Sequence, residues 1–324
     1  MQFSLAPYRD DLAEGPDVWH CNWIEASDET KLRVCTWRCD APLGTVFLLQ
    51  GRTEYIEKYG RVVKMFVDCG WSVVAIDWRG QGYSDRPEHD PMQGYVDHFA
   101  EYQHDIDALI NYANEQNLPK PWNMLGHSMG GCIGLRALHR HLSEFDHVAF
   151  SGPMWGIEFG ALINPLAGAI AKIGIGLGMA KSYVPTTTSE CYLLNGEFEG
   201  NRLTNDPESW SYMVTQVKED QDLRLGGPSF SWVNAAALEM KELMSSTPPN
   251  IPALTLLGTD EAVVKAQNIR NYMAKWQNSI LWEIQKGRHE VLMEKHELLN
   301  KLINGIDAFF RDDVVTDTTI VAAK

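Results

Sequence analysis

The fold of this 324-residue chain is decided by the stretch W-N-M-L-G-H-S-M-G-G, from Trp122 to Gly131. Its first four residues are typical of a short buried strand, and a helical pattern begins directly after the serine. Gly126 and Gly130 frame Ser128 in a G-x-S-x-G motif. A strand that turns this tightly into a helix has no room for side chains two residues before and after the serine, and the two glycines remove them.

Ser128 is therefore expected at the carboxyl end of a strand and at the N-terminus of a helix. The helix dipole favours negative charge that develops at such a place. Without this setting the motif would be weak, because a glycine-rich turn can carry an incidental serine. The setting favours a nucleophilic serine.

Apolar runs alternate with helical patterns on both sides of the motif, which is typical of a parallel sheet covered by helices on both faces. The predicted strands are Thr45–Gln50, Ser72–Asp77, Trp122–Leu125, Asp146–Ser151, Ala253–Leu257 and Ile280–Ile284. The predicted helices are Tyr55–Cys69, Tyr95–Gln116, Met129–Leu142, Lys265–Trp276 and Lys295–Phe310. Two earlier runs with a turn between them predict an N-terminal hairpin, Val18–Ala26 and Leu32–Cys39.

The alternation stops between residues 153 and 228, where several Gly and Pro residues occur and no strand pattern is clear. This segment is predicted to be an inserted helical cap on a core formed by residues 1–152 and 229–313. The end of the chain, residues 314–324, is predicted to be a disordered tail.

The composition limits the possible partners. The net charge is −15, from 28 basic and 43 acidic residues, which gives no electrostatic footprint for nucleic acid and leaves at most peripheral membrane contact. The run Ile163–Val184 is apolar, but Lys172 and Lys181 interrupt it, so buried or amphipathic helices are predicted rather than a membrane span. The N-terminus lacks the pattern of a secretory signal.

The six cysteines are scattered, with no C-x-x-C pair and no Cys/His array of zinc type. They are predicted to be reduced in a cytoplasmic protein that holds no metal.

A serine hydroxyl needs a base, and in chains built around such a turn an acid and then a histidine follow the serine. Of the five histidines after Ser128, His289 lies in a short loop after the last predicted strand, where the base belongs. The other four fall on predicted helices or at the start of a strand: His139, His141, His147 and His296.

The acid is expected in the loop after the penultimate strand, where Asp260 and Glu261 stand side by side. Glu261 is favoured because it lies three residues after Gly258 and three before the apolar Val264. A loop one residue shorter would select Asp260 instead. Either carboxylate could hold the imidazole in one tautomer and stabilise its protonated form.

An oxyanion formed at the substrate carbonyl needs two backbone donors about 3 Å away. One is predicted to be the amide of Met129, directly after the nucleophile. The other is predicted to be the amide of Arg52, in the loop after the first parallel strand, where Gly51 permits a close approach of the backbone.

Four sequence blocks agree with one family, and the chain resembles the bacterial lysophospholipase and monoacylglycerol lipase-like branch of the α/β-hydrolases. The blocks are Gln50-Gly51 with Glu54-Tyr55, Asp77 to Ser84 (D-W-R-G-Q-G-Y-S), Gly126 to Gly131 and Gly287-Arg288-His289-Glu290. The resemblance implies an α/β-hydrolase fold with about eight strands, no cofactor, and ester hydrolysis through an acyl-enzyme. Ser128 matches the nucleophile, His289 the histidine, and Glu261 or Asp260 the acid. Relatives commonly carry His-Gly where this chain has Gln50-Gly51.

Residues and resemblance together predict serine-dependent hydrolysis of a carboxylic ester in a small lipid, a lysophospholipid or a monoacylglycerol. Three alternatives use the same fold on a non-lipid acyl substrate: a carboxylesterase, a thioesterase or an acyltransferase. A non-catalytic ligand-binding homologue is a further alternative. Acyl chain length, headgroup and oligomeric state stay open at this stage.

Overall fold

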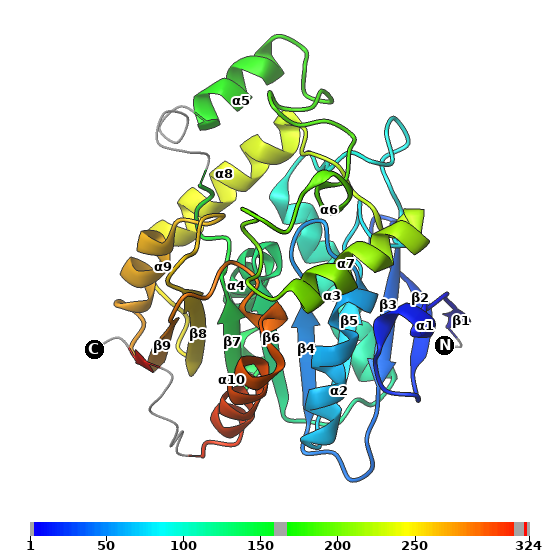
Figure 1. The fold of residues 1–324 in the computed structure, drawn as a ribbon, viewed down its shortest axis with the longest axis vertical. Helices are drawn as coiled ribbons and strands as arrows, with labels where there is room; N and C mark the ends of the chain where they lie inside the picture. The colour runs from blue at the N-terminus through cyan, green and yellow to red at the C-terminus, as the bar shows by residue number, and fades with distance from the viewer. Residues whose placement is uncertain (1–2, 159–166, 314–320, 323–324) are drawn as a thin grey trace.

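The apolar runs form a single sheet in the part of the chain that the structure, a computed structural model, describes: residues 3–158, 167–313 and 321–322 (Figure 1). The strand order is β1-β2-β3-β5-β4-β6-β7-β8-β9-β10. Within these residues the strands are β1 (Ser4–Leu5), β2 (His20–Glu25), β3 (Lys31–Trp37), β4 (Thr45–Leu49), β5 (Ser72–Ile76), β6 (Trp122–His127), β7 (His147–Ser151), β8 (Ala253–Gly258), β9 (Ser279–Ile284) and β10 (Val321–Ala322). The about eight strands predicted correspond to β2–β9, and the two outermost strands have only two residues each.

Strands β4 to β9 run parallel to one another, whereas β1, β2 and β3 form an antiparallel extension on β5, and β10 pairs antiparallel with β9. Every residue of β4 through β8 is buried, as expected for strands that are covered on both faces. The carboxyl ends of parallel strands share one edge of the sheet. The loops that leave this edge therefore bring segments distant in sequence together.

Helices cover both faces of the sheet. The α-helices are α1 (Asp10–Ala13), α2 (Gly60–Asp68), α3 (Tyr102–Glu115), α4 (Met129–His141), α5 (Ala167–Gly176), α6 (Tyr192–Asn195), α7 (Pro207–Glu219), α8 (Phe230–Ser245), α9 (Ala266–Met273) and α10 (His296–Phe310). Short 3-10 turns are η1 (Ile56–Tyr59), η2 (Phe99–Glu101), η3 (Leu142–Glu144), η4 (Gln221–Leu223) and η5 (Val291–Met293).

Two hydrophobic cores lie on opposite faces of the sheet. Alternate residues of β4 show the division: Phe47 and Leu49 pack with α3, α4, α8 and α9, whereas Val46 and Leu48 pack with α2 and α10. Successive side chains of a strand point to opposite faces, so each core strand contributes to both clusters.

The segment predicted as a cap, residues 153–228, lies between β7 and the α8–β8 unit. It carries α5, α6 and α7, and Figure 1 shows these helices beyond the carboxyl edge of the sheet. Helix α5 packs against α8. Single β-bridges join Ile157 to Val264 and Tyr183 to Ser229. Residues 159–166 lie outside the described part of the chain.

The apolar run Ile163–Val184 starts outside the described residues and continues as α5. Ala171 of this helix is buried, while Ile173 is 62% exposed and Leu177, just after it, is 72% exposed. Among the described residues, no helix combines the length and the apolar character that crossing a bilayer requires.

The prediction that all six cysteines are reduced is wrong for Cys21 and Cys35, which form a disulfide. The two residues stand directly opposite each other on the antiparallel strands β2 and β3, with their Cα atoms 4.1 Å apart. Their pairing depends on the register of the hairpin, which a spacing of 14 residues does not reveal.

The predicted disordered tail is described only at β10. There Val321 and Ala322 pair with Glu283 and Trp282 of β9. Residues 314–320 and 323–324 lie outside the described residues.

Candidate active site

Ser128 occupies a sharp turn between β6 and α4, with φ 47° and ψ −115°. A β-carbon on Gly126 would come within 3.0 Å of the Gly130 carbonyl oxygen, and one on Gly130 within 2.1 Å of the Leu49 carbonyl oxygen. Only glycine fits at these two positions. The left-handed backbone of a non-glycine residue is strained, and such strain is concentrated at functional sites.

The predicted base meets the predicted nucleophile. Ser128 Oγ lies 2.9 Å from His289 Nε2, close enough for the hydroxyl to donate a hydrogen bond to the ring. His289 follows β9 in a short loop, and its side chain is buried. The two residues are 161 positions apart in the chain, and the shared edge of the sheet brings them together.

The structure places Glu261, and not Asp260, against this histidine. His289 Nδ1 lies 2.8 Å from Glu261 Oε2, and the other carboxylate oxygen accepts hydrogen bonds from the amides of Val263 and Val264 at 2.6 and 3.1 Å. Burial alone would raise the pKa of Glu261, but the neighbouring His289 and these amides lower it below its ordinary value. Asp260 is exposed, and its carboxylate accepts a long contact of 3.4 Å from the Thr259 hydroxyl.

Gly152 is a residue of this site that the sequence analysis missed. It directly follows β7 with φ 47°, and a β-carbon there would lie 3.2 Å from both Glu261 Oε2 and His289 Nδ1. Its lack of a side chain lets the backbone approach the acid–histidine pair. A glycine directly after a predicted strand was the available signal.

The two amides predicted to hold an oxyanion lie on adjoining segments. Met129 is the first residue of α4, so its N–H has no partner within the helix. Arg52 lies in residues 50–54, which we call the oxyanion loop after its predicted role. It stands between Gly51, whose amide donates to the Glu54 carboxylate, and Thr53, whose amide donates to Gln81. Within the described chain no acceptor bonds the Arg52 amide.

The side chain of Arg52 is unusual because no carboxylate contacts it among the described residues. One Nη atom donates to the Gly226 carbonyl at 2.7 Å, and the guanidinium lies 5.1 Å from the Trp232 ring. Its Nε is buried without a partner. Burial lowers the pKa of Arg52 to about 10. A cation held in this way has unused donors for an anion.

Gln50 is the residue at which this chain departs from the pattern of the family that it resembles. Its side-chain amide donates to Asp77 at 3.0 Å, and its backbone carbonyl accepts from Trp78 Nε1 at 2.8 Å. The start of the oxyanion loop is therefore held by hydrogen bonds to the two residues that follow β5.

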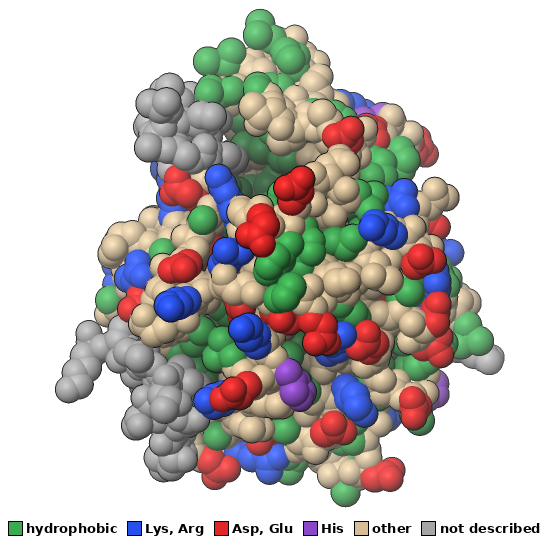
Figure 2. Space-filling view, viewed as in Figure 1, with side chains coloured by type: hydrophobic (Ala, Val, Ile, Leu, Met, Phe, Trp, Pro, Cys, Tyr) green, Lys and Arg blue, Asp and Glu red, His purple; other side chains and the backbone are tan. Residues whose placement is uncertain are grey.

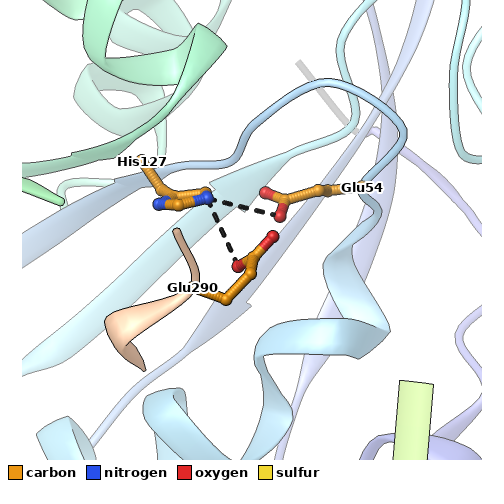
Figure 3. A group of neighbouring side chains, drawn as sticks. All are labelled: Glu54, His127 and Glu290. Atoms are coloured by element: carbon orange, nitrogen blue, oxygen red, sulfur yellow. Dashed lines mark ion pairs between the residues drawn. The ribbon is translucent and has the colours of Figure 1, made fainter. Parts of the chain in front are cut away.

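Four buried ionisable side chains next to the site also escaped the sequence analysis. Figure 3 shows three of them, Glu54, His127 and Glu290, pointing toward one another, and Lys58 contacts both carboxylates. Glu54 follows β4, His127 is the last residue of β6, and Glu290 follows His289. We call these four residues the ion network. The available signals were the spacing of four residues between Glu54 and Lys58 and the position of Glu290 directly after His289.

The group Glu54, His127 and Glu290 has the donor types and the spacing of a metal site. Lys58 Nζ, however, contacts Glu54 and lies 2.9 Å from Glu290. An ammonium therefore takes the cation position between the carboxylates, and a divalent ion there would face it at contact distance. The residues do not fit a metal.

The other histidines after the nucleophile lie away from it. His141 contacts Asp107 at 2.7 Å, and His147 contacts Asp312 at 2.9 Å. His139 lies 3.3 Å from the Ser246 hydroxyl, and His296 begins α10.

The first bulky apolar residues of the segment predicted as a cap are Met154, Trp155 and Phe159. Trp155 is fully buried, and its ring packs against Phe150 and Tyr272, so it belongs to the core. Met154 is buried as well, and Phe159 lies outside the described residues. Three cavities of about 570 to 700 Å³ open elsewhere on the described surface, and neither Ser128 nor His289 lines them.

The sheet, the turn at Ser128 and the buried histidine define a serine hydrolase of the α/β-hydrolase class. The chain belongs to the Hydrolase_4 family, whose description is "Serine aminopeptidase, S33". The model of this family matches residues 40–296.

Relatives and solved structures agree with this assignment. Lysophospholipase L2 of Escherichia coli K12 is 26% identical over 294 residues, 87% of this chain and 85% of that protein. Probable lysophospholipase L2 of Haemophilus influenzae is 28% identical and covers 82% of each chain. A soluble variant of monoglyceride lipase from Saccharomyces cerevisiae superposes with a TM-score of 0.73 at 18% identity, over 95% of this chain and 99% of that one, which shows the fold. These matches support hydrolysis of a lipid ester.

Proposed function

We propose that this protein hydrolyses the carboxylic ester of a small lipid, a lysophospholipid or a monoacylglycerol, through an acyl-enzyme on Ser128. The continuous contact from Ser128 Oγ to His289 Nε2 (2.9 Å) and from His289 Nδ1 to Glu261 (2.8 Å) carries the proposal. This arrangement activates a hydroxyl that is otherwise a poor nucleophile.

In this mechanism Ser128 attacks the ester carbonyl while His289 takes the hydroxyl proton. Glu261 holds the imidazole in the tautomer that can accept it and stabilises the imidazolium that forms. The amides of Met129 and Arg52 donate to the oxyanion. His289 then protonates the leaving alcohol. Water attacks the acyl-enzyme in the same way, with His289 taking its proton, and the fatty acid is released.

Arg52 supports the lysophospholipid over the neutral monoacylglycerol as the first substrate to test. Its guanidinium lies on the oxyanion loop and has no carboxylate partner among the described residues. A guanidinium pairs well with phosphate oxygens, which a lysophospholipid carries and a monoacylglycerol lacks.

Access to a lipid substrate suggests that the protein touches a membrane peripherally through the cap. Ile173 and Leu177 present exposed apolar side chains around α5, at the end of the molecule that Figure 2 shows with green side chains gathered at the top. Sedimentation with lipid vesicles tests this contact. Loss of co-sedimentation in Ile173→Ser/Leu177→Ser is the expected result, and binding equal to wild type would contradict it.

The decisive assay compares wild type with Ser128→Ala on several substrates. These are a lysophospholipid, a monoacylglycerol, short and long p-nitrophenyl esters, an acyl thioester, and an aminoacyl p-nitroanilide for the activity that the family description names. Release of fatty acid by wild type and silence of the variant are expected. An acyl group that appears on an added alcohol would identify an acyltransferase.

The same assay separates the headgroups. In Arg52→Gln, turnover of the lysophospholipid should fall while turnover of the monoacylglycerol holds. If wild type turns over no ester, thioester or amide, the esterase proposal fails and a ligand-binding homologue takes its place.

A further inference from the structure

The ion network holds two carboxylates and one ammonium in a place that water does not reach. Glu54, Lys58, His127 and Glu290 are each at most 4% exposed. With a neutral imidazole the network would carry one uncompensated negative charge, and an unpaired buried charge is costly. A proton on His127 removes that charge.

The surroundings of His127 suit an imidazolium. Its Nδ1 lies 3.2 Å from the Ser151 hydroxyl of β7, and its Nε2 lies 3.3 Å from Glu290 and 3.7 Å from Glu54. His127 Nε2 has no hydrogen-bond partner among the described residues, so its contact with Glu290 is electrostatic. An imidazolium can direct an N–H at both sides, whereas neutral imidazole has one N–H.

Other charged groups around the ring act in both directions. Lys58 of η1 opposes the proton, and the ring of His289 lies 4.9 Å away, centroid to centroid. Burial by itself would lower the pKa of His127, but Glu290 and then Glu54 outweigh burial and raise it above its ordinary value.

The ionised state of Glu290 depends on Lys58 and His127. Within the described residues its carboxylate meets Lys58 and His127 and accepts from no backbone amide. Burial would raise the pKa of Glu290, but Lys58 and His127 hold it well below its ordinary range. The charge of one partner therefore sustains the charge of the other.

The ion network contacts the oxyanion loop, the serine turn and the histidine loop, whose relative positions the reaction depends on. His127 directly precedes Ser128, and Glu290 directly follows His289. Glu54 accepts a hydrogen bond from the Gly51 amide and another from Tyr59 at 2.7 Å, which shapes the oxyanion loop.

We propose that Glu54, Lys58, His127 and Glu290 are positioning residues, and that a protonated His127 locks the oxyanion loop, the serine turn and the histidine loop together. Loss of that proton leaves a buried negative charge, loosens the three segments and lowers kcat on the alkaline side. This inference rests on the proposed ester hydrolysis for its kinetic readout only.

The kinetic test uses charge compensation. His127→Asn keeps an amide that can donate toward Ser151 but carries no charge, so kcat should fall about ten- to hundred-fold. The kcat of this variant should not fall further as the pH is raised. His127→Asn/Glu290→Gln removes one carboxylate as well and restores the balance. We expect it to recover about tenfold of the loss in kcat. A merely structural role would make the double variant the worse of the two.

His141→Asn is the matched control, since His141 pairs with Asp107 away from the site. It should keep the wild-type kcat and pH profile. Wild-type kcat in His127→Asn, or a double variant no better than His127→Asn, would overturn the proposal.

A second measurement needs neither turnover nor a folded His127→Asn protein. Nitrogen-15 NMR of wild type at about pH 7 should show a buried imidazole with protons on both nitrogens, and Glu290→Gln should convert it to a neutral ring. If the protonation state of the imidazole is the same in Glu290→Gln as in wild type, the proposal is overturned, whether or not any ester is hydrolysed. Failure of the esterase assays alone leaves this NMR result to decide.

Discussion

The molecule holds two buried ionic clusters of different design. In the Arg33 cluster, which consists of Arg33, Glu57 and Asp77, all three side chains are fully buried. Arg33 donates to Glu57 at 2.6 and 2.7 Å and to Asp77 at 2.7 Å, joining β3 to η1 and to the end of β5. In the ion network, a lysine and a histidine take the place of the arginine.

Each cluster has two carboxylates, but they accommodate the second negative charge differently. Asp77 accepts hydrogen bonds from Gln50 and from the amides of Ile56 and Tyr83, which are neutral donors. Glu290 faces only cations among the described residues. Burial would lower the pKa of Arg33, but Asp77 and Glu57 outweigh burial and raise it above its ordinary value. This guanidinium therefore stays charged at alkaline pH, whereas an imidazole titrates near neutrality. We therefore expect the Arg33 cluster to keep its cation as pH rises and the ion network to lose one.

The largest effect is expected where a charge contacts the base itself. Glu261→Gln should lower kcat about 10⁴-fold, because the amide favours the wrong tautomer of His289. Asp260→Asn, one residue away and exposed, is the matched control and should stay close to wild type. Steady-state kinetics on the preferred ester measures both, and the reverse order would assign the acid to Asp260.

Removing the arginine of the first cluster should cost stability rather than chemistry. Arg33→Met leaves two buried carboxylates without their cation, so the free energy of unfolding should fall by about 3–5 kcal/mol. Urea unfolding followed by circular dichroism measures this fall. The kcat per folded molecule should hold, and a loss of kcat without a loss of stability would erase the contrast between the clusters.

The pH dependence of stability should come from the ion network. Because the pKa of folded His127 is raised above the unfolded value of about 6.5, its contribution is complete below that pH and is lost as pH rises through the folded pKa. The slope is at most about 1.4 kcal/mol per pH unit for one proton.

Unfolding free energies across neutral and alkaline pH should show this decline in wild type. It should be absent in His127→Asn. Glu290 acts with the opposite sign: its lowered pKa gives stability that is lost as pH falls through the folded value. An equal alkaline slope in both proteins would assign the titration to another group.

The smallest effect is expected at a surface pair. Arg270 contacts Glu283 at 2.6 Å, but the side chains are 37% and 22% exposed. Arg270→Gln should change the free energy of unfolding by no more than about 1 kcal/mol, since water screens the pair. A loss of stability as large as that of Arg33→Met would mean that burial does not determine how much an ion pair contributes to the free energy of unfolding.

Much of the fold could be predicted because its signals are local. Buried strands appear as short apolar runs, and most predicted strands, such as Thr45–Gln50 against β4, end within two residues of the observed ones. The helix predicted as Tyr55–Cys69 begins with a 3-10 turn at Ile56, and the one predicted as Tyr95–Gln116 begins only at Phe99, again with a 3-10 turn. Their α-helical parts start at Gly60 and Tyr102. Periodicity identifies an element more reliably than its first turn.

The choice between Asp260 and Glu261 shows where local signals end. Both are carboxylates in the same loop, and composition cannot separate them. The turn after Gly258 buries Glu261, because the amides of Val263 and Val264 point at its carboxylate. The disulfide between Cys21 and Cys35 depended in the same way on the register of two strands.

The sequence by itself determined the parallel sheet, the strained serine turn and the histidine that follows the last long strand, because each is written within a few neighbouring residues. Only the tertiary structure decided which carboxylate meets His289, that Arg52 has no carboxylate partner among the described residues, and that Glu54, Lys58, His127 and Glu290 share one buried place. Those facts arise from loops up to 236 positions apart that meet at one edge of the sheet. Burial there makes the charges interdependent, because the interior screens them far less than water does.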